Sequence, residues 1–180
     1  MIFRTLLVMW RSRRAKRLSM LSVSRLRFRV WPSDLDILGH MNNGVYFSFM
    51  DLGRMDLVIR AGAWEIFNTK GWMPVAASET MSFRRSLQPW QIFELQTRIV
   101  GYDERAVYMQ QRFVVDGDVY AEGVVRGRFA RKTGGTVTME ELGDVLGIDS
   151  TGFPPPEWVT TWAKDAALPP SRATHRSDWA

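Results

Sequence analysis

The sequence contains no cysteine, and this absence excludes several kinds of chemistry. Disulfide bonds, thiolate catalysis and cysteine-ligated metal centres cannot form, and the composition fits a reducing compartment, so we expect a cytoplasmic protein. Histidine is scarce as well, with two among 180 residues. The sequence has no glycine-rich phosphate loop and no metal-like spacing of His, Asp and Glu, so neither a cofactor nor a metal ion is expected.

Acidic residues are missing from positions 1–30, which carry nine Lys and Arg side chains. The rest of the chain has 15 basic and 19 acidic side chains and is therefore net negative. The overall charge of +5 is thus a property of the N-terminus. This distribution argues against a nucleic-acid-binding domain, and no nucleic acid is expected as a partner.

Residues 1–21 begin with an apolar stretch that is followed by the basic cluster Arg11–Arg17. The apolar part is shorter than the roughly 20 residues that span a bilayer. Its charges follow the apolar part, which is the reverse of a secretory signal. Two interpretations stay open. Either a helix here makes peripheral contact with an anionic membrane or a partner, or the segment is an extension packed on its own domain or an over-extended start.

The periodicity of the remaining chain predicts one long helix among strands. Residues 44–61 are apolar on nearly every side and precede Gly62, which predicts a buried helix that ends there. Within it, Gly53 predicts the close approach of a strand, and Asp56 and Arg60 predict a minor surface ion pair. Alternating residues predict strands at 25–30, 73–83, 93–99, 107–115 and 119–129, with turns at 103–104 and 116–118. An α+β fold follows, in which a long buried central helix is wrapped by a curved antiparallel sheet of about five strands.

A polar segment joins the first strand to this helix and carries the pattern Asp36-x-x-x-His40-x-Asn42-Asn43-x-x-Tyr46. The segment resembles the hotdog-fold acyl-CoA thioesterases of the 4-hydroxybenzoyl-CoA thioesterase-like group, over roughly residues 24–131. It is also similar to the Asp-x-Asn-x-His-Val-Asn-Asn signature of acyl-ACP thioesterases. Leu38 departs from that second signature, which has asparagine there, and so favours the simpler mechanism centred on the aspartate.

The resemblance implies a catalytic role for Asp36, as the nucleophile or as the base that activates water. Backbone N–H groups around 43–45, at the positive end of the helix, are the expected oxyanion donors. His40 and Asn43 are expected to assist catalysis, and Asn42, Gly44 and Tyr46 to contact substrate. Structural alternatives stay open: Asp36 as a turn cap, His40 as a structural hydrogen-bonding group, the asparagines as helix caps, and Asp34 as a loop or capping residue.

The same resemblance implies an acyl-CoA substrate, with the active site between two subunits of a homodimer or tetramer. Arg84, Arg85 and Arg105 are candidates for the CoA phosphates, although each is equally well explained as a solvated strand-end residue. Glu79 is either a second carboxylate near the helix start or an edge-exposed residue. The expected acyl pocket is lined by Phe47, Met50, Met81 and Phe83. A non-catalytic acyl-ligand-binding or membrane-associated hotdog protein is the alternative function.

We expect three parts: a basic extension at 1–23, a hotdog domain at 24–150 and a tail at 151–180. A short helix is predicted at 139–148. The tail contains five prolines, which predict no regular structure, and three tryptophans, which predict that part of it packs against the domain. The sequence shows no internal repeat.

Overall fold

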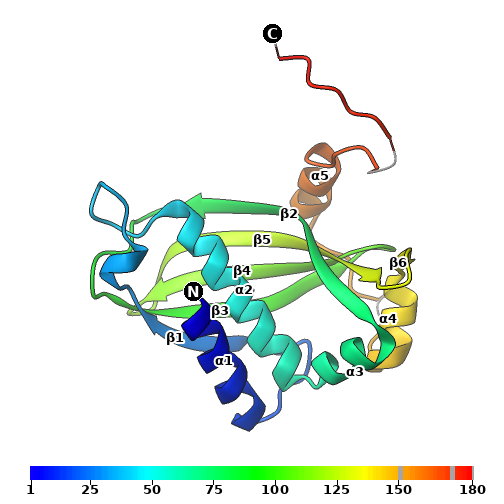
Figure 1. The fold of residues 1–180 in the computed structure, drawn as a ribbon, viewed down its shortest axis with the longest axis horizontal. Helices are drawn as coiled ribbons and strands as arrows, with labels where there is room; N and C mark the ends of the chain where they lie inside the picture. The colour runs from blue at the N-terminus through cyan, green and yellow to red at the C-terminus, as the bar shows by residue number, and fades with distance from the viewer. Residues whose placement is uncertain (150–151, 171–172, 180) are drawn as a thin grey trace.

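The computed structural model describes residues 1–149, 152–170 and 173–179, and Figure 1 shows their arrangement. The predicted domain boundary at 150/151 lies outside the described residues. The elements in order are α1 Ile2–Arg14, β1 Ser24–Arg29, the short 3-10 helix η1 Pro32–Asp34, α2 Asn43–Arg60, α3 Ala63–Lys70, β2 Trp72–Phe83, β3 Ile92–Tyr102, β4 Val107–Val115, β5 Asp118–Arg131, β6 Thr136–Val137, α4 Met139–Leu146 and α5 Glu157–Asp165.

The main sheet is antiparallel with strand order β1-β3-β4-β5-β2, and the two-residue strand β6 is added to β5. Helix α2 lies across one face of this curved sheet (Figure 1). The predicted five-stranded sheet around a long central helix is therefore confirmed. The β4–β5 turn shows how the sequence directs the pairing, because Asp116 and Gly117 adopt φ angles of 49° and 84°, which two-residue hairpin turns require.

The central helix packs unusually close to the sheet at Gly53. A Cβ atom there would lie 2.4 Å from Thr97 Oγ1 and 2.8 Å from Gln111 Nε2. Gln111 is buried and donates to Met50 O and to Thr97 Oγ1, both at 2.9 Å, so its amide is satisfied beneath the helix. The predicted reason for the glycine, close approach of a strand, is confirmed.

Helix α1 is fixed to α2 through a buried carboxylate. Asp56 is 2% exposed and accepts hydrogen bonds from Ser12 Oγ and Ser24 Oγ, both at 2.6 Å. Arg60 Nη1 lies 3.3 Å from Asp56 Oδ2. The predicted i,i+4 pair exists, but the prediction that it lies on the surface is wrong, because α1 covers it. No helix among the described residues has both the length and the apolar character needed to cross a membrane.

Two helices were not expected. α3 follows Gly62 at once, since this glycine adopts φ 79° and lets the chain reverse direction. α5 shows that the prediction of an irregular tail is wrong for residues 157–165. Pro156 directly precedes this helix, a position where the missing N–H of proline costs little. Val159 packs against the sheet, whereas Trp158 and Trp179 are exposed.

Candidate active site

The segment between β1 and α2 forms a tight turn that presents Asp36 and His40. Asp36 N–H donates to His40 O at 3.0 Å, and Gly39 N–H donates to Asp36 O at 3.1 Å. Gly39 adopts φ 80°, a conformation that glycine tolerates and most residues do not. Met41 N–H, which donates to Leu87 O at 2.9 Å, ties the base of the turn to the rest of the domain. The backbone therefore fixes the side chains that leave the turn.

The Asp36 carboxylate and the His40 imidazole lie together. Asp36 Oδ2 is 3.5 Å from His40 Nδ1, and Asp36 Oδ1 accepts from Leu38 N–H at 2.9 Å. The two side chains are 21% and 28% exposed, so both are open to a small reactant. His40 Nδ1 has no hydrogen-bond partner among the described residues. This arrangement offers one carboxylate oxygen that is anchored by an amide and a second that faces a polarisable imidazole.

The start of α2 is capped by Asn42, whose Oδ1 accepts from Gly44 N–H at 2.8 Å. Val45 N–H donates to Asn42 O at 2.9 Å. Two of the three expected oxyanion donors are therefore engaged in capping. Asn43 N–H forms no hydrogen bond to a described residue and is the donor left at the positive end of the helix.

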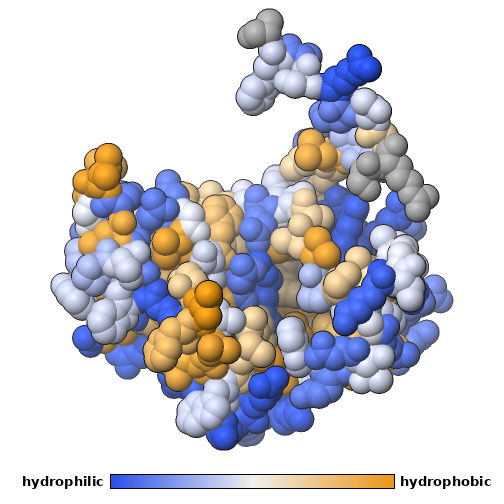
Figure 2. All heavy atoms as spheres, in the orientation of Figure 1, coloured by the Kyte–Doolittle hydropathy of each residue, from blue (hydrophilic) through white to orange (hydrophobic). Residues whose placement is uncertain are grey.

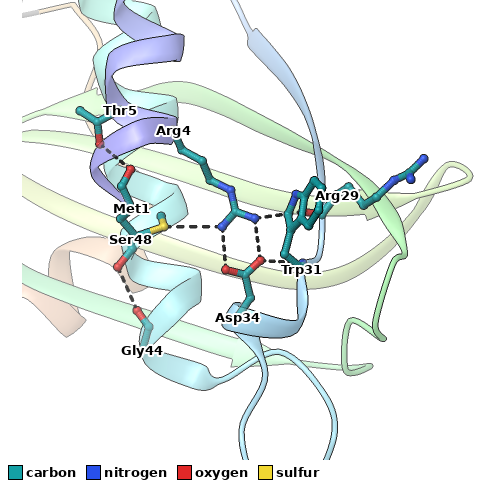
Figure 3. Close-up of polar contacts among 8 residues, drawn as sticks. All are labelled: Met1, Arg4, Thr5, Arg29, Trp31, Asp34, Gly44 and Ser48. Carbon is teal, nitrogen blue, oxygen red and sulfur yellow. Dashed lines mark hydrogen bonds and ion pairs between the residues drawn. The ribbon is translucent and has the colours of Figure 1, made fainter.

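Asp34 anchors the same segment to the N-terminal helix (Figure 3). Arg4, on α1, places Nη1 2.6 Å from Asp34 Oδ1 and Nη2 2.8 Å from Asp34 Oδ2. Asp34 Oδ2 also accepts from Trp31 N–H at 2.8 Å, and Asp34 O accepts from Asn42 N–H at 2.8 Å. Asp34 is thus the capping residue that was predicted. Its ion pair with Arg4 was not foreseen, since the sequence offers no local signal for a contact across thirty residues.

Tyr46 lies in the core rather than in an open site. Its ring contacts Phe83 and Phe113 edge-on, with centroids 5.0 and 4.9 Å apart, and it is 1% exposed. Its hydroxyl oxygen accepts from Leu87 N–H at 3.1 Å. Burial raises the pKa of Tyr46 above its ordinary value. The structure therefore gives this tyrosine a role in holding α2 and residue 87 together.

The three candidate arginines lie at opposite ends of the sheet. Arg84 and Arg85 both pair with Asp118, and Arg85 Nη1 is 2.9 Å from Asp118 Oδ2. They lie at the end where β1 stops and the Asp36 turn begins, because Arg29 pairs with Ile92 and Phe83 with Ala121. Arg105 lies in the β3–β4 turn at the other end. One subunit therefore cannot bring all three to one phosphate group.

Glu79, on β2, belongs to a charged cluster with Asp51 and Arg54 of α2. Arg54 Nη2 lies 3.0 Å from Glu79 Oε1 and also pairs with Asp51. The other terminal nitrogen, Arg54 Nη1, donates to Gln111 Oε1 at 3.0 Å. Burial raises the pKa of Glu79, and the nearby Arg54 opposes that rise. Asp51 and Arg54 were not predicted as site residues. The i,i+3 spacing of opposite charges was the signal that marked them.

Asp51 and Arg54 border a cavity of about 420 Å³ between α2 and strands β2, β4 and β5. Its apolar wall includes Met55, Val58, Val75, Met109 and Phe129. The four residues predicted to line an acyl pocket do not line this cavity. Met50 of α2 is in the core, and Phe47 of α2 and Met81 of β2 pack against the core cluster. Phe83 is exposed at the end of β2.

Comparisons with known proteins identify the family of the chain. The family model of the thioesterase-like superfamily matches residues 30–163. Protein THEM6 of Xenopus laevis is 38% identical over 99 residues, which cover 55% of this chain and 48% of that protein. The chain therefore spans about half the length of the curated relatives that it matches.

Solved structures match the fold. A probable thioesterase from Escherichia coli has a TM-score of 0.64 at 18% identity, over 68% of this chain and 95% of that chain. A 4-hydroxybenzoyl-CoA thioesterase variant complexed with 4-hydroxybenzoyl-CoA has a TM-score of 0.61 at 13% identity, over 69% and 97%. The fold is that of the hotdog thioesterases. This chain belongs to the thioesterase-like superfamily, as the Asp36–Tyr46 pattern predicted.

Proposed function

We propose that the protein hydrolyses an acyl-CoA thioester to a carboxylic acid and free CoA. The observation that carries this proposal is the Asp36 turn, which presents a partly exposed carboxylate beside His40 and just before the N-terminus of α2. Membership of the thioesterase-like superfamily supports the reaction class. The acyl-CoA class rests on the resemblance of residues 24–131 to CoA thioesterases.

The reaction follows from the chemistry of a carboxylate beside backbone amides. Asp36 acts as a base that takes a proton from water while the water oxygen attacks the thioester carbonyl carbon. The carbonyl oxygen becomes an oxyanion, which Asn43 N–H and the positive end of α2 stabilise. The tetrahedral intermediate then breaks its carbon–sulfur bond, and the proton passes to the departing CoA thiolate. In the alternative route the same carboxylate attacks the carbonyl carbon directly, and the carbon–sulfur bond breaks as CoA leaves as the thiolate. Water then hydrolyses the resulting anhydride, which frees the carboxylic acid, restores Asp36 and supplies the proton for the thiolate.

His40 supports either route by its position against the carboxylate. With Nδ1 3.5 Å from Asp36 Oδ2, the ring orients the carboxylate and the attacking water. Asn42 serves as the helix cap that leaves Asn43 N–H available. Each of these three residues therefore has a distinct part in the proposal: base, orienting group and cap.

The substrate is proposed to extend in two directions from this turn. The cavity of about 420 Å³ along α2 has the apolar wall that an acyl group needs. Arg84 and Arg85, exposed at the same end of the sheet as the turn, are the proposed contacts for the CoA phosphates. A homo-oligomer is proposed as well, since β2 is an edge strand whose residues 73–77 are exposed.

The test is release of free CoA from a panel of short, long, branched and aromatic acyl-CoAs, with Asp36→Asn protein as the control. Turnover of at least one member that Asp36→Asn abolishes is the expected result. Binding of acyl-CoA without turnover would instead support the alternative, a non-catalytic acyl-ligand-binding protein. Turnover that persists in Asp36→Asn protein would remove Asp36 from the mechanism.

A further inference from the structure

Helix α1 packs against the protein through Arg4, Val8 and Ser12, whereas most of its large apolar side chains face outward. The inward residues Arg4 and Ser12 make the ion pair with Asp34 and the hydrogen bond to Asp56. The outward residues Phe3, Leu6 and Trp10 are 78%, 61% and 55% exposed. Their i,i+3,i+7 spacing makes one continuous stripe. In Figure 2 an apolar patch lies over the position of α1, on the face toward the viewer.

The apolar stripe continues into basic residues. Arg13 and Arg14 follow it on the last turn of α1, and the Arg14 guanidinium lies 4.3 Å from the Trp10 ring centroid. A groove of about 780 Å³ runs beside the helix, between α1 and β1. Arg11, Arg27 and Arg29 line it and form no ion pair with any described residue. The surface therefore offers apolar contact and unpaired positive charge side by side.

Charge decides which occupant fits this surface. A second copy of the chain would bring like charges together across a two-fold interface, because positions 1–30 carry nine basic residues and no acidic ones. A bilayer with acidic headgroups supplies both complements, an apolar interior for the stripe and negative charge for the arginines. Tryptophan beside arginine is also the pairing found where a helix lies in the membrane interface.

We propose that the outward face of α1 is a membrane-docking surface, on which the helix lies in the plane of an acidic bilayer. Phe3, Leu6 and Trp10 enter the region between headgroups and acyl chains, and the basic residues contact the headgroup phosphates. This inference does not depend on the proposed catalytic chemistry. It accounts for two features at once, the exposed apolar stripe of α1 and the concentration of positive charge at one end of the chain.

The test is flotation of the full chain with vesicles of phosphatidylcholine alone and with vesicles containing about 30% phosphatidylglycerol. We expect flotation with the acidic vesicles only, and release at about 0.5 M salt. The variant Phe3→Ser/Leu6→Ser/Trp10→Ser is expected to bind the acidic vesicles at least about tenfold more weakly. Arg13→Gln/Arg14→Gln is expected to weaken binding about tenfold.

Matched controls come from the tail, where Leu168 and Trp179 are exposed apolar residues and Lys164 and Arg176 are exposed basic residues. Leu168→Ser/Trp179→Ser and Lys164→Gln/Arg176→Gln are expected to bind like the unmodified protein. Circular dichroism checks that each variant is folded. If the apolar variant does not fold, Arg13→Gln/Arg14→Gln still tests the proposal. A chain that stays unbound with acidic vesicles overturns the proposal. So does an apolar variant that binds normally, or one that only changes oligomeric state in light scattering.

Discussion

Arg4 of α1 and Asp34 of the 3-10 helix η1 form an ion pair in which two guanidinium nitrogens meet two carboxylate oxygens at 2.6 and 2.8 Å. Asp34 is buried, and its backbone oxygen accepts from the Asn42 N–H that precedes α2. The N-terminal helix thus holds the segment that carries Asp36, although it contributes no group to the reaction.

Arg4→Met is expected to destabilise the protein by about 3 kcal/mol, because it leaves the buried Asp34 carboxylate without its cation. Urea unfolding followed by circular dichroism measures the loss. Arg4→Met/Asp34→Asn removes both charges and is expected to recover most of the stability. If the double variant is no more stable than Arg4→Met, the loss in Arg4→Met does not come from the unpaired Asp34 carboxylate.

Asp36→Asn is expected to lower the rate of CoA release about 10²- to 10⁴-fold, since the amide cannot take a proton from water. Asp51→Asn is the matched control, because Asp51 is an exposed carboxylate at the cavity edge that pairs with Arg54. Its expected loss is less than about tenfold. If Asp51→Asn lowers the rate of CoA release more than Asp36→Asn does, the catalytic carboxylate is Asp51 of α2 and not Asp36 of the turn.

Arg84→Gln/Arg85→Gln is expected to raise KM for acyl-CoA about tenfold while kcat changes little, since phosphate contacts far from the thioester bind substrate and transition state alike. Arg105→Gln is the control, because Arg105 lies at the far end of the sheet. Steady-state CoA release with each variant gives both constants. Equal effects from the two variants would contradict the proposed path of the CoA moiety.

Tyr102 and Tyr108 provide a matched pair for stability at alkaline pH. Burial raises the pKa of Tyr102 to about 12, and its hydroxyl has no hydrogen-bond partner among the described residues. The neutral phenol is therefore favoured in the folded state. Its contribution to stability is complete below the ordinary pKa of 10.0 and is lost as pH rises toward about 12. Tyr102→Phe is expected to reduce this alkaline loss.

At neutral pH, replacing each tyrosine by phenylalanine is expected to change the free energy of unfolding in opposite directions. Tyr102→Phe removes a hydroxyl without a partner and should leave the free energy of unfolding unchanged or raised. Tyr108 Oη donates to Asp103 Oδ2 at 2.5 Å, so Tyr108→Phe should cost about 1.5 kcal/mol or more. Urea unfolding at pH 7 and at several values up to 12 measures both effects. A Tyr102→Phe protein less stable than Tyr108→Phe at pH 7 would contradict the assignment.

Local sequence pattern was enough to predict the central helix, the main strands and the close approach of a strand at Gly53. These features repeat along the chain with a fixed period or depend on neighbours in sequence. The helix α5 was missed because prolines on both sides suggested irregular structure, whereas Pro156 stands where a helix accepts proline.

The candidate site was predictable where it is local and not where it depends on distant contacts. The turn from Asp36 to the cap at Asn42 could be read from one continuous segment. The burial of Asp56 under Ser12, and the ion pair of Asp34 with Arg4, depend on how α1 packs. Nothing in the spacing of those residues encodes that packing, because the partners are at least thirty residues apart.

The strand order β1-β3-β4-β5-β2 has a consequence for how the chain folds as it is synthesised. The first two strands made, β1 and β2, lie at opposite edges and never pair with each other. β2 pairs only with β5, from Ala121 to Arg131, so its sheet partner is complete only when residue 131 has been made. Closure of the sheet therefore waits for long-range contacts, which slow folding relative to a chain of local hairpins. During that interval, the unpaired β2 is the segment most exposed to pairing with another molecule.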